Sequence, residues 1–142
     1  MHKPLISGIL IALLSLASLS HAHNNKAHGD SASAAQHDQV AQQMKQMQRA
    51  YKKAVRSQTI AQMKPAVMQL IALSKQATAM PYDDDPTTRA DYKKGMRALQ
   101  ADLDQLKNAM QANNLPLARK ILTTQIKATR NQAHEKLDVD ED

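Results

Sequence analysis

The sequence contains no cysteine, phenylalanine or tryptophan, and only three glycines. Without cysteine the chain can form no disulfide, so its stability must come from its core, alone or together with a ligand. Aromatic side chains make up 2% of the residues, which leaves little on which bases could stack, so no nucleic-acid partner is expected. No glycine-rich phosphate loop is present in the sequence.

The inventory of catalytic side chains is equally short. A nucleophile needs a base and an orienting group beside it, yet His134 is the only histidine of the predicted folded region. Glu135 is the only glutamate before the acidic C-terminal residues, so no Glu-x-x-His pair for a carboxylate-bound metal centre is present. We therefore do not expect an enzyme.

Residues 1–22 have the layout of a secretory signal peptide. A short basic start precedes an apolar run, Leu5–Leu19, and small residues stand before a cleavage site after Ala22. The apolar run is too short to span a bilayer, and no basic flank follows it that would keep it as an anchor. The sequence thus predicts export, cleavage and no membrane insertion of the mature chain.

Residues 23–37 (HNNKAHGDSASAAQH) are polar, rich in small side chains and without periodicity. We expect a disordered leader here, because such a segment buries too little apolar surface to fold. It holds three of the six histidines, and a histidine-rich tract can bind transition metals. A solvated linker is the simpler interpretation.

Between residues 38 and 137 the apolar residues recur at spacings of three and four, which places them in stripes on α-helices. The four stripes are Val40, Met44, Met47, Tyr51 and Ala54; Ile60, Met63, Val67, Leu70, Ser74 and Ala77; Tyr92, Met96, Leu99, Leu103, Leu106 and Met110; and Leu122, Ile126, Thr129, Ala133 and Leu137. Short connections make successive helices antiparallel. The pattern predicts an all-α, antiparallel up-down-up-down four-helix bundle over residues 38–137, followed by an acidic tail, 138–142.

Three helix starts are marked by their side chains. Asp38 can cap the first helix, and Asp85 with Pro86 predicts the start of the third. Pro65 would cost about 3 kcal/mol inside a helix. We therefore expect the second helix to begin at Lys64, which puts Pro65 at its first position.

Met44 and His134 have unremarkable interpretations when each is taken alone. A methionine on a core stripe usually fills space, and a histidine near a helix C-terminus is usually a surface residue. In an antiparallel bundle, however, the beginning of the first helix is level with the end of the fourth. A thioether and an imidazole facing each other there match the ligand set of a low-spin electron-transfer haem.

The strings around these residues resemble the cytochrome b562 family. They are Thr129–Lys136 (TRNQAHEK) with Gln125–Lys127 before it, the first-helix residues Val40, Met44, Met47 and Tyr51, Ala61–Lys64 (AQMK), and Asp91–Met96 (DYKKGM). The resemblance covers residues 38–137. The string around His134 is the most specific of them.

The resemblance implies a soluble periplasmic electron-transfer protein that binds one non-covalent haem b per chain, with iron held by Met44 and His134. It further implies that Met47, Tyr92 and Met96 line the porphyrin and that Arg130 lies near its edge. Covalent attachment is excluded by the lack of Cys-x-x-Cys-His. We expect a monomer with a redox protein as its partner, as yet unknown.

The sequence departs from the family at the pocket, where Tyr92 and Met96 replace phenylalanines and Ala133 replaces an aromatic residue. Fewer aromatic contacts would weaken haem affinity. Two alternatives stay open. One is a periplasmic copper- or other metal-binding protein that uses the histidine-rich leader with Met44 and Met47. The other is a cofactor-free helical binding module.

Overall fold

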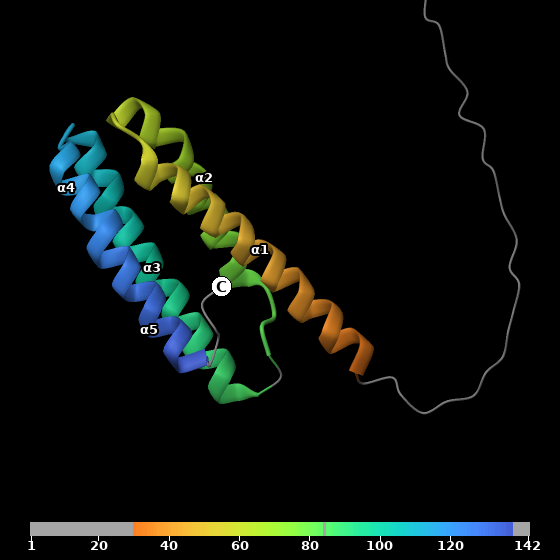
Figure 1. The fold of residues 1–142 in the computed structure, drawn as a ribbon. Helices are drawn as coiled ribbons and strands as arrows, with labels where there is room; N and C mark the ends of the chain where they lie inside the picture. Colours follow the sequence, from red (N-terminus) through yellow and green to blue (C-terminus); the bar gives the residue numbers. More distant parts are fainter. Residues whose placement is uncertain (1–29, 84, 138–142) are drawn as a thin grey trace, which may run out of the picture.

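The computed structural model describes residues 30–83 and 85–137. The described elements are α1 (Asp30–Arg56), α2 (Ile60–Ala79), α3 (Pro86–Gln111), α4 (Leu115–Lys120), the π-helical η1 (Ile121–Ile126) and α5 (Lys127–Leu137). The last three are continuous and are together called the C-terminal helix. Successive helices run antiparallel (Figure 1), which confirms the predicted all-α four-helix bundle. The predicted signal peptide, residues 23–29 and the acidic tail lie outside the described residues.

Side-chain caps start three of the helices. Thr59 Oγ1 accepts a hydrogen bond from the Gln62 amide at 3.2 Å, and Asn114 Oδ1 accepts one from the Leu117 amide at 3.1 Å. Asp85 caps α3 through a 2.7 Å bond from the Thr88 amide. This bond lowers the pKa of the exposed Asp85 carboxyl below its ordinary value. The predicted start of α3 at Asp85 and Pro86 is therefore confirmed.

The predicted start of α1 is wrong. The helix begins at Asp30, so Asp38 lies inside it, and the disordered leader predicted as far as His37 does not hold for its last eight residues. The serine- and alanine-rich stretch before His37 contains strong helix formers, and helix propagates readily once the packed part of α1 provides the nucleus. Residues 34–39 are exposed, and Val40 is the first buried residue among the positions of α1 whose burial is described. This extension thus runs beyond the core.

The predicted start of α2 is also wrong. Its first residue is Ile60, and Pro65 lies within the helix. The missing Pro65 N–H removes one helical hydrogen bond, at a cost of about 3 kcal/mol. Two features offset this cost. The Thr59 cap holds the first turn, and Met63, Ala66 and Val67, which flank the proline, are all buried. The burial of these neighbours therefore outweighs the unfavourable effect of a proline inside the helix.

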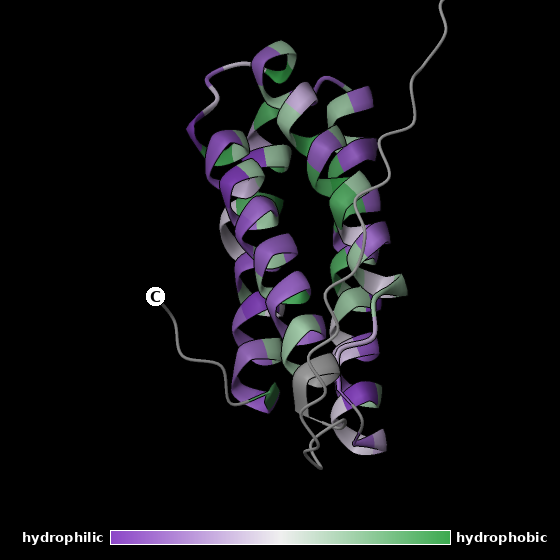
Figure 2. Cartoon of the chain, turned by 90° about the vertical axis from the view of Figure 1, so that its right-hand side faces the viewer, coloured by the Kyte–Doolittle hydropathy of each residue, from purple (hydrophilic) through white to green (hydrophobic). Residues whose placement is uncertain are grey.

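The core lies along the predicted stripes. α1 packs on α2, α2 on α3, and α3 on the C-terminal helix, whereas α1 meets the C-terminal helix most closely at η1. The arrangement is two helix pairs, α1 with α2 and α3 with the C-terminal helix (Figure 1). Hydrophilic residues cover much of the outer faces (Figure 2). No helix within the described ranges has the length and apolar character needed to cross a bilayer.

Candidate functional site

The six residues expected at the site come from three helices, α1, α3 and α5, and lie towards one end of the bundle. They are Met44 and Met47 on α1, Tyr92 and Met96 on α3, and Arg130 and His134 on α5. The first part of α1 and the last part of α5 lie at this same end (Figure 1). We call it the open end. The opposite end, around the turn between α1 and α2 and the turn before α4, is called the closed end.

Burial divides the six residues into two groups. Met47, Tyr92 and Met96 are buried in the core, whereas Met44, Arg130 and His134 are half-buried. The buried group belongs to α1 and α3. The half-buried pair on α5 belongs to an element without any fully buried residue. The side of the open end formed by α5 is thus only partly covered.

Tyr92 is buried in this region and is hydrogen-bonded to α2. Its hydroxyl donates a 2.6 Å hydrogen bond to the Ala77 carbonyl on α2. Burial, with a smaller contribution from Tyr82, raises the pKa of Tyr92 to about 12. The phenol therefore stays neutral at physiological pH and keeps donating this bond.

Tyr82 is a site residue that the sequence interpretation missed. Its ring stacks on Tyr92 with centroids 4.4 Å apart and planes 4° apart, and His37 meets it edge-on at 5.9 Å. Burial, and then the Asp83 carboxylate, raise the pKa of Tyr82. Tyr82 could have been noticed in the sequence because it is one of only three tyrosines. Its position in the loop before α3 indicates a ring that packs against another side chain.

His134 carries an unsatisfied atom. Its Nδ1 is buried and, within the described part of the chain, has no hydrogen-bond partner. A buried polar atom without a partner costs about 1–3 kcal/mol, and such atoms are uncommon in native proteins. A half-buried imidazole in this condition is suited to a ligand that the protein itself does not supply.

A close contact between α3 and α5 lies beside His134. A Cβ placed on Gly95 would come within 3.1 Å of the Ala133 Cβ, which is tighter than ordinary van der Waals contact. The two small residues therefore allow α5 to approach α3 at this point. Ala133 stands where the family resemblance expects an aromatic residue, and its small size is part of this approach.

The π-helical segment η1 precedes the two α5 site residues. Leu122, Ile126, Arg130 and His134 follow one another at intervals of four, and all four are at least half-buried. An α-helix repeats every 3.6 residues, so such a series would drift around it. The wider π turn compensates for this drift. The stripe expected from the sequence continues from Ile126 through Thr129 and Ala133, so it passes beside Arg130 and His134. The repeated interval of four was the missed signal.

Two hydroxyl groups satisfy carbonyls in and beside the π segment. Tyr51 on α1 donates to the Leu122 carbonyl at 2.8 Å, and Thr123 donates to the Arg119 carbonyl at 2.8 Å. Burial raises the pKa of Tyr51, and the Arg130 charge lowers it by a smaller amount. Tyr51 joins α1 to the helix that carries His134.

Arg130 is held at its guanidinium by its neighbour. Its Nη2 and Nε donate to Asn131 Oδ1 at 3.0 and 3.2 Å.

Across residues 30–83 and 85–137 no group of three or more His, Cys, Asp and Glu side chains could hold a metal ion. The histidine-rich residues proposed for metal binding lie outside these ranges, apart from His37.

Comparison with known proteins identifies the family. The family model for cytochrome b562 matches residues 39–138, most of the chain and nearly all of the bundle. A search among curated proteins gives no match. The matched region includes all six residues expected at the site, and the family consists of electron carriers that are not enzymes. The chain therefore belongs to the cytochrome b562 family of haem-binding helical cytochromes.

Proposed function

We propose that this protein is a periplasmic electron carrier that binds one haem b non-covalently, with the Met44 thioether and the His134 imidazole as axial ligands of the iron. The observation that carries the proposal is the buried, unpartnered Nδ1 of His134 at the open end of a cytochrome b562 family bundle. A ligand atom that bonds this nitrogen would remove an energetic penalty that the protein alone leaves in place.

The surrounding residues are suited to a flat apolar macrocycle. Met47, Tyr92 and Met96 provide buried apolar surface on α1 and α3, and α5 has no fully buried residue. A large rigid ligand would cover the half-buried side of α5 and supply the fixed shape that a methionine-rich core lacks. The Tyr82–Tyr92 stack adds aromatic surface that partly replaces the missing phenylalanines.

The axial ligands define what the site would do. Haem supplies a one-electron Fe(III)/Fe(II) couple. Met44 and His134 would fill both axial positions and leave none for a substrate, which favours electron transfer. The soft thioether of Met44 favours Fe(II) and raises the reduction potential. The Arg130 guanidinium would lie near the haem edge. There its positive charge would attract the haem propionates and stabilise the reduced Fe(II) state.

The N-terminal residues and the family both support a periplasmic location. Residues 1–22 have the features of a signal peptide, and cytochromes of this family are typically periplasmic. We propose that the mature chain acts there as a monomer and exchanges electrons with a partner protein.

Absorption spectroscopy of the reconstituted protein tests the proposal. The mature chain with added haem b should show an intense Soret band and sharp visible bands on reduction. Met44→Ala and His134→Ala should each abolish the low-spin spectrum, because each removes one axial ligand. Met68→Ala is a matched control, since Met68 is exposed on α2, and it should leave the spectrum unchanged.

Two outcomes would contradict parts of the proposal. If Met44→Ala and His134→Ala both retain the wild-type spectrum, the ligand assignment is wrong. If the protein binds copper but no haem, and deletion of residues 23–37 abolishes copper binding, the metal-binding alternative is correct.

A further inference from the structure

The first two helices carry charge of only one sign over most of their length. Between Gln39 and Tyr82 the sequence has no aspartate or glutamate. The cations of this stretch are Lys45, Arg49, Lys52, Lys53, Arg56, Lys64 and Lys75. The rest of the bundle, from Asp83 to Leu137, mixes both signs. The positive charge of the protein is therefore least compensated on α1 and α2.

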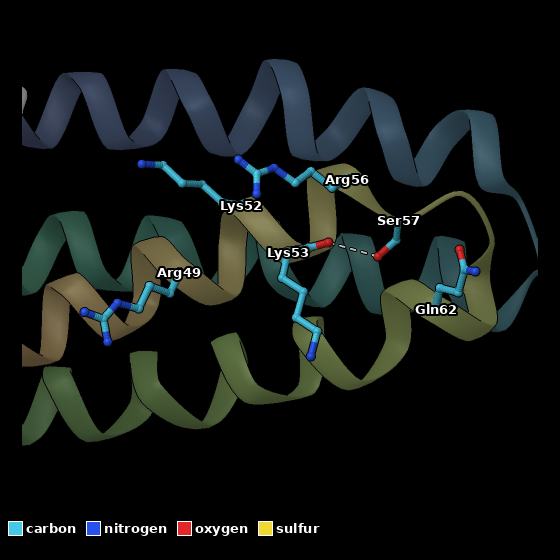
Figure 3. A pocket seen from close by; sticks show the side chains of 6 residues that line it. All are labelled: Arg49, Lys52, Lys53, Arg56, Ser57 and Gln62. Carbon is cyan, nitrogen blue, oxygen red and sulfur yellow. Dashed lines mark hydrogen bonds between the residues drawn. The ribbon is translucent and has the colours of Figure 1, made fainter.

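Four of these cations line one open groove on α1, towards the closed end. Arg49, Lys52, Lys53 and Arg56 surround a volume of about 500 Å³ together with Ser57 and Gln62. Figure 3 shows that Lys53 extends to the α2 side of α1, whereas Lys52 and Arg56 extend to the opposite side. The four cations therefore spread positive charge over both sides of α1.

The spacing of the four cations concentrates their charge. They stand at positions i, i+3, i+4 and i+7, which are neighbours on a helix surface and extend about 10 Å along its axis. Like charges at this spacing repel one another. None of the four side chains forms an ion pair within the described residues, and their own hairpin contains no carboxylate from Gln39 to Tyr82. Among the residues that the structure describes, the groove therefore has no anionic counterpart.

The C-terminal helix adds a fixed positive charge beside this groove. The Arg119 guanidinium donates from Nη2 to the Ser57 carbonyl at 3.2 Å and to Gln58 Oε1 at 3.2 Å. Ser57 also lines the groove, and its hydroxyl donates to the Lys53 carbonyl at 3.0 Å. The turn that closes the groove is therefore held in place by hydrogen bonds.

We propose that this groove docks an acidic surface of a partner protein. Positive charge spread over two helical turns matches several carboxylates better than a single small anion. Val55, which precedes Arg56 on α1 and is 37% exposed, adds apolar surface to this part of the helix. A membrane surface is less suitable, because the chain has no phenylalanine or tryptophan to insert. Nucleic acid would lack aromatic stacking partners.

Docking of an acidic partner does not require haem, so it can be tested independently of the proposed function. If both hold, the partner lies along the helix that carries the iron ligand. Arg49 follows Met44 by five residues, which is about 8 Å along the axis of α1. The docked acidic protein would then be the electron donor or acceptor.

The test uses a ten-residue oligoglutamate peptide as the probe. It is titrated at low ionic strength into the ¹⁵N-labelled mature chain, and amide shifts report where it binds. We expect shifts concentrated at residues 49–62 and weaker binding at physiological salt, because salt screens exposed charges. The double variant Arg49→Glu/Lys53→Glu should weaken binding at least tenfold.

The matched control changes the net charge equally at another place. Lys107 and Lys127 are exposed on α3 and α5, so Lys107→Glu/Lys127→Glu should leave the dissociation constant within about twofold. Circular dichroism and the haem spectrum check that both variants remain folded and competent. Equal weakening by the two variants would mean that only net charge matters and would overturn the proposal.

Two further outcomes would assign the groove to another occupant. Inorganic phosphate, or vesicles containing an anionic phospholipid, could bind as tightly as the peptide. If the Arg49→Glu/Lys53→Glu variant also loses that binding, docking of a protein is overturned. A dimer in analytical ultracentrifugation that dissociates when the acidic residues 138–142 are removed would also overturn it, because the occupant would then be a second copy of this chain.

Discussion

The two ends of the bundle are built from the same four helices, yet they are packed differently. At the closed end every helix contributes side chains without measurable exposure, namely Ala54, Met63, Val67, Leu106, Ala118 and Leu122. At the open end α5 contributes no buried residue, and Met44, Arg130 and His134 are half-buried. The helices therefore complete a core at one end and leave it incomplete at the other.

The difference arises from the residues on the inner face of the C-terminal helix. Towards the closed end this face consists of Ala118, Ile121 and Leu122, which fill space with apolar atoms. Beyond Ile126 it contains Arg130 and His134 instead. Polar and charged groups are costly to bury without partners, so this part of the helix cannot close against α1. The contrast indicates that the open end is organised for a ligand and the closed end for stability.

Truncation of a leucine at each end should give the largest effect. Leu122 is fully buried, so Leu122→Ala should cost about 2–5 kcal/mol of unfolding free energy. Leu137 is half-buried on α5, and Leu137→Ala should cost roughly 1 kcal/mol. Urea unfolding of the haem-free chain measures both. Equal losses would show that the two ends are packed alike.

Haem should stabilise the open end specifically. A ligand bound only by the folded state adds about 2.7 kcal/mol at one hundred times its dissociation constant, so the melting temperature should rise by on the order of 10 °C. His134→Ala should remove this gain and leave the haem-free melting temperature nearly unchanged. Identical melting curves with and without haem would contradict the conclusion that the open end is organised for a ligand.

Tyr92 should give a pH-dependent effect. Its pKa in the folded state, about 12, exceeds the ordinary value of 10. Above pH 10 the unfolded state therefore ionises first, and the stability that Tyr92 contributes falls as pH rises towards 12. Below pH 10, Tyr92→Phe should cost about 1 kcal/mol through loss of the bond to Ala77.

Unfolding free energies of the wild type and Tyr92→Phe at pH 8 to 11 measure this difference. The wild-type advantage should shrink as the pH passes 10. A constant difference across the range would mean that the Tyr92 phenol is not held neutral by its surroundings.

Gly95→Ala should give the smallest change in stability but a clear change in the site. Helix propensity favours alanine by about 1 kcal/mol, while its Cβ would press on Ala133 at 3.1 Å. These terms nearly cancel, so α5 should move slightly and haem should bind more weakly. Ala133→Gly in the same chain should restore haem affinity. If affinity does not recover, the contact does not position His134.

Much of the fold and part of the site were predictable from local patterns. The interval of three and four in the stripe from Tyr92 to Met110 specifies a helix and its buried face, because both follow from the helical repeat. The Asp85–Pro86 pair marks the start of α3 through its own hydrogen-bonding chemistry. The antiparallel order then brings Met44 and His134 to one end, whatever the details of packing.

The remaining features depend on contacts between distant segments. Burial of Met63, Ala66 and Val67 allows α2 to include Pro65 despite the lost hydrogen bond, and Tyr51 on α1 satisfies a carbonyl of η1, 71 residues away in sequence. The Tyr82–Tyr92 stack and the unpartnered Nδ1 of His134 likewise exist only when the helices are assembled. Local spacing determines which face of a helix is apolar, whereas burial of one segment by another decides which polar groups are left without partners.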